Sequence, residues 1–163
     1  RYAGAVCAEE GNGALMRENI MIRRLQKADI DSVLALWLHT NLQAHSFIPA
    51  AYWENNLAAV RDMLPQAEVY VYEDAGEIQA FVGLNGEYIE GIFVADKMQS
   101  QGIGKRLLDF IKTKKTELHL HVYQKNTGAV RFYQREDSEI RHAGVDAPTG
   151  EKDYAMAWMQ GQL

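Results

Sequence analysis

A glycine-rich turn between an apolar strand and an amphipathic helix constrains this chain more than any other feature. Residues 99–105 read Gln-Ser-Gln-Gly-Ile-Gly-Lys, with a strand predicted over residues 88–95 and a helix over residues 102–114. The first N–H groups of a helix have no intrahelical acceptor, and together with the helix dipole they bind phosphate. Glycine carries no Cβ, so a ligand approaches the main chain closely there. The turn therefore predicts a site for the pyrophosphate of a cofactor.

Two familiar phosphate-binding motifs do not fit this turn. A P-loop has glycine five positions before its Gly-Lys pair and Ser or Thr after the lysine, whereas this chain has Gln99 and Arg106. A dinucleotide fingerprint has a third glycine where this chain has Leu107. The pattern that remains is Gln-x-x-Gly-x-Gly.

Composition and charge narrow the class of protein. The 163 residues, 47% hydrophobic and 24% charged, suit one globular domain with a substantial core. A net charge of −5 disfavours broad binding to nucleic acid or anionic membranes and is compatible with a basic substrate such as an amine. The single cysteine, Cys7, excludes a disulfide framework within the chain and disfavours a cysteine zinc site, so no metal is expected. No apolar run approaches membrane-spanning length, and a cytoplasmic location is expected.

The chain divides into a short extension and one domain. Residues 1–20 show little periodicity and are expected to be an extension, a tag or a flexible arm, whereas residues 21–163 are expected to form the domain. Cys7 lies in the extension and is a poor candidate for a nucleophile.

Hydrophobic periodicity predicts an α/β (α+β) fold. Strands are predicted over residues 20–25, 67–72, 78–84, 88–95, 117–123, 138–143 and 154–159. A first helix is predicted to begin at residue 29 and to end before a loop over residues 40–48. Further helices are predicted over residues 49–64, over residues 102–114 and after a cap at Asn126. This order predicts a mixed, mostly antiparallel central sheet with helices on both faces.

A second motif follows the first in the chain. Residues 120–126 read Leu-His-Val-Tyr-Gln-Lys-Asn, and the helix after them carries Phe132 and Tyr133. With the Gln-x-x-Gly-x-Gly turn, this motif resembles the GNAT superfamily of acetyl-CoA-dependent N-acetyltransferases, over most of residues 21–160. It is most similar to bacterial GNAT proteins that acetylate protein lysines or N-termini. The resemblance implies the GNAT fold, acetyl-CoA as cosubstrate, and direct transfer to a primary amine without an acyl-enzyme.

The resemblance also implies which residues bind acetyl-CoA. The main chain of Phe93 and Val94 and the side chain of Asn126 are expected on the pantetheine arm. The residues expected around the pyrophosphate are Gln99, Gln101, Gly102, Ile103, Gly104 and Lys105. Arg106 is expected in a solvated basic turn rather than on the ribose phosphate.

Amine acetylation needs a group that deprotonates the amine and a group that protonates the leaving thiolate. By resemblance Tyr133 is the general acid; alternatively it only packs beside Phe132. His121 stands where many relatives have Glu, and it is either the general base or a strand histidine with a hydrogen-bond partner. The alternative bases are Glu87, Tyr88 and Glu90. His45 is expected to contact the acceptor or to be an ordinary polar loop residue. Tyr52 and Trp53 are expected to line the acceptor pocket or to belong to the core.

One departure from the family pattern follows Tyr133. Asp137-Ser138 stands in place of the usual Gly-Phe, which predicts a local loss of stability or a shifted register. It also favours an alternative function, a regulatory module that senses CoA with weak catalysis. A third alternative is a nucleotide-binding protein without CoA preference. The sequence leaves the acceptor open between a protein lysine, a protein N-terminus and a small amine. It also leaves the oligomeric state open between a monomer and a homodimer.

Overall fold

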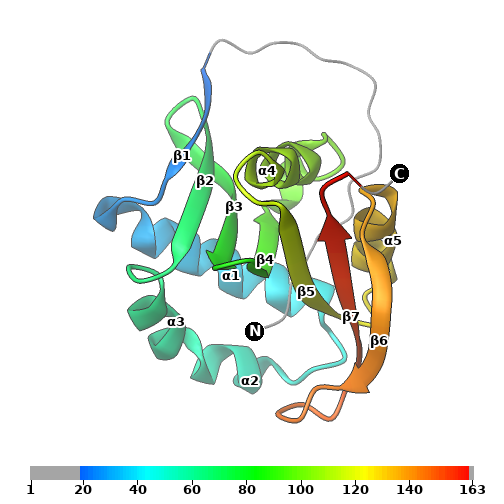
Figure 1. Cartoon of the computed structure of the whole chain (residues 1–163). Helices are drawn as coiled ribbons and strands as arrows, with labels where there is room; N and C mark the ends of the chain where they lie inside the picture. Colours follow the sequence, from blue (N-terminus) through cyan, green and yellow to red (C-terminus); the bar gives the residue numbers. More distant parts are fainter. Residues whose placement is uncertain (1–18, 162–163) are drawn as a thin grey trace.

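One seven-stranded sheet forms the centre of the structure, a computed structural model that describes residues 19–161 (Figure 1). The extension expected over residues 1–20, including Cys7, lies outside the described residues except for its last two positions. Ile20 already belongs to the first strand. Within residues 19–161, no helix is long and apolar enough to cross a membrane.

The elements follow the predicted order. The strands are β1 Ile20–Arg24, β2 Glu68–Asp74, β3 Glu77–Asn85, β4 Tyr88–Val94, β5 Glu117–Tyr123, β6 Glu139–Val145 and β7 Lys152–Met159. The helices are α1 Ile30–Ala44, α2 Ala50–Asn55, α3 Leu57–Met63, α4 Ile103–Lys112 and α5 Thr127–Arg135, with 3-10 turns at Lys27–Asp29 and Asp96–Met98.

Two helix boundaries differ from the prediction. Residues 40–44 continue α1 instead of forming a loop, because the polar side chains there bond within the helix. Thr40 Oγ1 donates to Leu36 O at 2.7 Å, and Asn41 Nδ2 donates to Trp37 O at 2.9 Å. The helix predicted over residues 49–64 is divided at Asn56, whose Nδ2 donates to Tyr52 O at 2.6 Å.

The sheet contains a point of divergence. Its strand order is β1-β2-β3-β4-β5-β7-β6, and every neighbouring pair is antiparallel except β4 and β5. These two parallel strands share one register position, Tyr88 opposite His119, and separate beyond it (Figure 1). The carboxyl-terminal half of β4 therefore has an edge without a ladder to β5.

A bulge lies in β4 next to this divergence. Gly91 pairs with Gly83 and Ile89 pairs with Leu84, which leaves Glu90 without a partner in β3. A bulge adds a residue to one strand and increases the local twist. The extra residue therefore turns β4 where it leaves β5.

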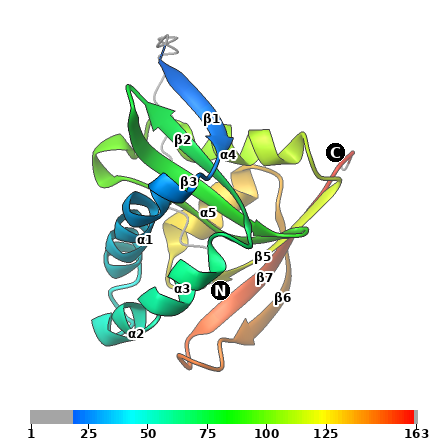
Figure 2. The same cartoon turned by 90° about the vertical axis from the view of Figure 1, so that its left-hand side faces the viewer.

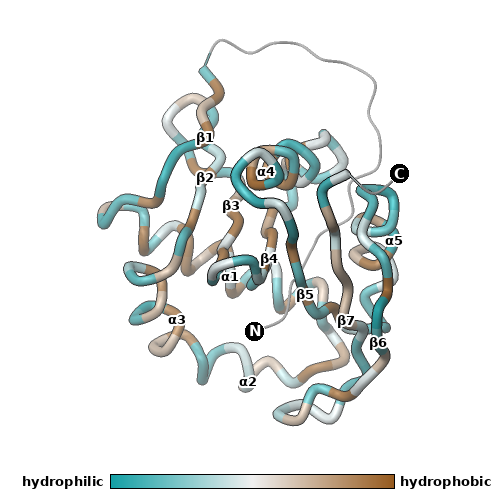
Figure 3. The backbone as a smooth tube through the Cα atoms, in the orientation of Figure 1, coloured by the Kyte–Doolittle hydropathy of each residue, from teal (hydrophilic) through white to brown (hydrophobic). Residues whose placement is uncertain are grey.

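The sheet buries a core on each face. One core packs against α4 and α5, and the other packs against α1, α2 and α3 (Figure 2). Apolar residues concentrate along the central strands and polar residues on the outer side of α4 (Figure 3). The prediction of a mixed sheet with helices on both faces is confirmed.

Helix α5 ends in the left-handed turn that glycine normally serves. Asp137 has φ +70°, its N–H donates to Gln134 O at 3.2 Å, and Ser138 N–H donates to Tyr133 O at 2.8 Å. These two bonds form a Schellman motif. Strand β6 pairs from Glu139 onward, and its register shifts only after Ile140. The departure from Gly-Phe is thus accommodated without displacing the helix end.

We expect Asp137→Gly to raise the free energy of unfolding by about 0.5–1 kcal/mol, because glycine adopts the left-handed conformation without the strain of an L side chain. Urea unfolding at neutral pH measures the change. Asp137→Ala is the matched control and should be no more stable than the wild type. A glycine variant no more stable than the wild type contradicts the assignment of strain to this position.

Candidate active site

The start of α4 presents open backbone donors. Ser100 and Gly102 both have left-handed backbones, with φ +63° and +79°, which turn the chain into the helix. The first intrahelical bond joins Arg106 N–H to Gly102 O at 3.0 Å, so the N–H groups of residues 103–105 have no intrahelical acceptor. Among residues 19–161, no side chain caps this helix. The turn has the form of an anion site.

Two side chains of the turn, those of Gln99 and Lys105, bond to other residues of the protein. Gln99 Nε2 donates to Val94 O at 3.2 Å and to Asp96 Oδ1 at 3.1 Å, which ties the turn to the end of β4. Gln101 is exposed. The Lys105 ammonium binds Asp109 at 3.0 Å and Glu136 at 3.1 Å. What the turn offers a diphosphate is therefore mainly the main chain of Gly102, Ile103, Gly104 and Lys105.

Arg106 was expected to be solvated, but its side chain also bonds to the protein. The residue is exposed, and its Nη1 donates to Tyr72 Oη at 3.2 Å. The bond joins α4 to β2. A structural contact therefore accounts for this cation.

We expect Gly102→Ala to weaken acetyl-CoA binding about tenfold, because an L-residue held at φ +79° is strained by about 1–2 kcal/mol and the turn shifts to relieve the strain. A Cβ at Gly102 meets nothing within 4 Å, so the effect comes from the backbone alone. Calorimetric titration measures the affinity. Ser100→Gly is the matched control and should bind at least as tightly as the wild type. Equal affinities for Gly102→Ala and the wild type would contradict the role of the turn.

The divergent half of β4 has buried side chains and main chain without a ladder partner in β5. The Phe93 ring stacks on Phe81 with centroids 4.7 Å apart, and Val94 packs in the core beneath α4. The register gives neither residue a partner in β5. A strand edge of this kind accepts an extended ligand by adding backbone hydrogen bonds.

Asn126 caps α5 and joins it to α1. Its Oδ1 accepts the Ala129 N–H at 3.2 Å, so its Nδ2 faces His45 Nε2, also at 3.2 Å. The residue is 8% exposed. The capping role is therefore realised, and binding to pantetheine stays a prediction.

His45 is a core residue rather than an acceptor contact. It is fully buried, with Nδ1 3.2 Å from Asn41 Oδ1, and its ring stacks on Trp53 with centroids 5.3 Å apart. Burial lowers the pKa of His45 to about 4, so the imidazole is neutral. Trp53 is also core, at 3% exposed, whereas Tyr52 is only half-buried. Of the three acceptor candidates, only Tyr52 retains accessible surface.

The structure brings together two of the candidate bases. Tyr88 Oη lies 2.9 Å from His121 Nδ1 across the junction of β4 and β5. Tyr133, on α5, is fully buried, and its hydroxyl has no hydrogen-bond partner in the described part of the chain. Burial raises the pKa of Tyr133, and Tyr88 raises it further, so this hydroxyl keeps its proton. Tyr88 thus adjoins His121.

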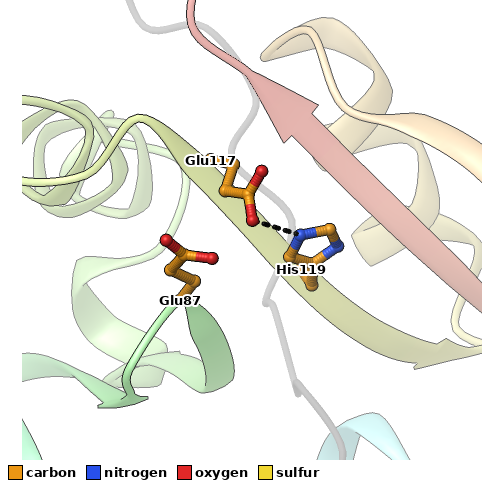
Figure 4. Close-up of side chains that lie close together, drawn as sticks. All are labelled: Glu87, Glu117 and His119. Carbon is orange, nitrogen blue, oxygen red and sulfur yellow. Dashed lines mark ion pairs between the residues drawn. The ribbon is translucent and has the colours of Figure 1, made fainter.

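A further group of polar side chains lies beside Tyr88 at the closed end of the β4–β5 junction (Figure 4). His119 Nε2 lies 3.4 Å from Glu117 Oε1, and one potential ligand atom from each of Glu87, Glu117 and His119 lies within 4.8 Å of the others. A hydrogen bond between the two carboxyl groups raises the pKa of Glu87 and lowers that of Glu117. Sequence reasoning named only Glu87. Polar residues alternate with apolar ones over residues 117–122, and this pattern could have placed Glu117 and His119 on the same face of the strand as His121.

Comparison with known proteins assigns the family. Residues 65–137 match the family model described as an acetyltransferase (GNAT) domain. The chain is 35% identical over 140 residues to the peptidyl-lysine N-acetyltransferase YiaC of Escherichia coli (strain K12), an alignment that covers 85% of this chain and 96% of the relative. The chain belongs to the GNAT family. It is therefore an N-acetyltransferase that uses acetyl-CoA, as the two sequence motifs predicted.

Solved GNAT structures share the fold. Apo-form YjaB from Escherichia coli superposes with a TM-score of 0.77 at 23% identity, covering 87% of this chain and 99% of that one. The PaiA N-acetyltransferase of Thermoplasma acidophilum, solved in complex with coenzyme A, gives a TM-score of 0.71 at 16% identity, covering 86% and 98%. At these identities the likeness concerns the fold alone.

Proposed function

We propose that this GNAT enzyme transfers the acetyl group to the side chain of protein lysines. The observation that carries the proposal is the 35% identity to a peptidyl-lysine N-acetyltransferase over 96% of that relative's length. A second relative with the same named activity, YjaB of Salmonella typhimurium, is 32% identical over 117 residues. Residues 21–163 form the catalytic domain in this proposal. The cytoplasmic location and the monomeric or dimeric state stay predictions.

The residues fit acetyl-CoA at three places. The open N–H groups of residues 103–105 suit its diphosphate, and the Tyr133 hydroxyl, which has no partner within residues 19–161, suits a group that acquires negative charge. The main chain of Phe93 and Val94, which has no ladder partner in β5, suits the pantetheine arm. When bound, acetyl-CoA supplies a thioester whose sulfur leaves as a thiolate.

Each proposed catalytic side chain transfers a proton. A lysine amine has a reference pKa of about 10.4 and arrives protonated, so a base must take its proton before it attacks. His121 is that base in this proposal, with Tyr88 at its Nδ1. Tyr133 is the acid, because burial keeps its hydroxyl protonated beside the place of reaction.

Mass spectrometry of acetylated peptides tests the acceptor. One peptide carries a lysine and a blocked N-terminus, a second carries a free N-terminus and no lysine, and a diamine represents small acceptors. We expect acetylation of the lysine peptide to dominate. Acetylation confined to the α-amine or the diamine contradicts the proposal, and tight CoA binding without turnover on any acceptor supports the regulatory alternative.

A further inference from the structure

We propose that Tyr88 is a catalytic residue that accepts the proton of the acceptor amine while passing its own proton to His121. The inference rests on the proposed acetyl transfer and assigns the base to a pair of side chains rather than to one. It is carried by the hydrogen bond between Tyr88 and His121 at the junction of β4 and β5.

The fold places this pair at the one junction that β4 and β5 share. The register sets Tyr88 opposite His119, and His121 lies two residues further along the same face of β5. Both side chains are half-buried, and Oη and Nδ1 are 2.9 Å apart. The bulge at Glu90 and the separation of the strands begin immediately after this point. The pair therefore lies at the closed end of the opening in the sheet, where the two strands begin to separate.

The Tyr88 hydroxyl occupies the approach to one nitrogen of His121. Its Oη lies 2.9 Å from His121 Nδ1, so a proton that leaves the amine for that nitrogen passes through Tyr88. Of the two members of the pair, Tyr88 is therefore the one that meets the amine.

The proton transfer balances. An N–H bond of the substrate ammonium breaks as an O–H bond forms on Tyr88 Oη, while the original O–H bond of Tyr88 breaks and an N–H bond forms at His121 Nδ1. Tyr88 is left neutral and His121 carries the positive charge. After Tyr133 has given its proton to the thiolate, His121 releases its proton to solvent and Tyr133 regains one from solvent. The nitrogen loses a second proton as the amide forms, and that proton leaves to solvent.

Other titratable groups lie near Tyr88 and His121. Glu87 adjoins Tyr88 in the chain, and Glu117 and His119 precede His121 on β5. The neighbours across the sheet are Asn85 on β3 and Ala155 on β7, which do not titrate.

The test compares Tyr88→Phe, His121→Gln and the double variant on the lysine peptide. We expect each single variant to lower kcat about 10²-fold, the usual effect of losing general base catalysis, with the KM for acetyl-CoA unchanged. The double variant should be no slower than the slower single variant, because the pair acts as one unit. Tyr154→Phe on β7 is the matched control and should keep wild-type kcat. A Tyr88→Phe kcat within twofold of the wild type, or losses that multiply in the double variant, would overturn the proposal.

Two further readouts separate catalysis from packing. A lysine analogue with a less basic amine arrives partly deprotonated, so the loss in Tyr88→Phe should shrink at least tenfold; a constant loss contradicts the relay. Without acetyl-CoA, the ¹⁵N spectrum of His121 should change at Nδ1 in Tyr88→Phe and not in Tyr154→Phe; an unchanged Nδ1 signal also contradicts it. If the wild type prefers another amine, the proposed acceptor is wrong, and the same comparison on that amine still decides the role of Tyr88.

Discussion

Replacing Tyr133 by phenylalanine should lower kcat about 10²-fold and leave the protein at least as stable as the wild type. The loss of rate follows from removing a general acid, which typically contributes 10²–10⁴-fold. The stability follows from the position of the hydroxyl, which is fully buried and has no hydrogen-bond partner among residues 19–161. An unsatisfied buried hydroxyl costs about 1–3 kcal/mol, and phenylalanine removes that cost while it keeps the ring.

Both effects are measured on the same preparation, by steady-state kinetics and by urea unfolding. Tyr123→Phe is the control for stability, because Tyr123 Oη donates to the buried Asp146 at 2.8 Å and its removal leaves that carboxylate short of a donor. We expect Tyr123→Phe to be destabilised where Tyr133→Phe is not. An unchanged kcat in Tyr133→Phe removes Tyr133 as the acid, and a loss of stability indicates that its hydroxyl is bonded in the free protein.

Lowering the pH from 6.5 to 4 should cost about 3 kcal/mol of folding stability through His45 alone, because its pKa falls from 6.5 to about 4 on burial. The sign follows from proton uptake. Between these pH values the unfolded chain binds a proton at His45 and the folded protein does not, so stability is present above pH 6.5 and is lost as the pH falls. Asp29, whose pKa is lowered by its bond to Arg23, contributes only at lower pH, below its ordinary value of 3.8.

Urea unfolding at a series of pH values measures this dependence. His45→Gln removes the titrating group and should flatten the profile between pH 4.5 and 6.5, whatever its stability at neutral pH. His142→Gln, on the exposed face of β6, is the matched control and should keep the wild-type slope. The same slope in His45→Gln as in the wild type would contradict the burial of a neutral imidazole.

Local patterns predicted the fold because each element satisfies its own periodicity. The glycines of the α4 turn and the alternation of β5 placed the two motifs correctly, and Gly102 does adopt the left-handed backbone that its residue type indicates. The error over residues 40–44 came from polarity. Thr40 and Asn41 suggest a loop, but within α1 they are buried and bond to carbonyl groups of their own helix.

The candidate site was harder to predict because its contacts join distant segments. His45 resembles a polar loop residue in sequence, whereas its burial depends on Trp53, Tyr123 and Asn126. Tyr88 and His121 were separate candidates for one role. Only the pairing of β4 with β5, together with the side-chain geometry, shows that they are hydrogen-bonded to each other.

Amide chemical shifts during titration with CoA test the central claim most directly, namely that the bare N–H groups at the start of α4 bind the diphosphate. We predict that the largest downfield changes fall on the N–H groups of Ile103, Gly104 and Lys105, and that Ser100→Gly preserves them. Saturable binding of CoA that leaves these three signals unmoved would contradict the account.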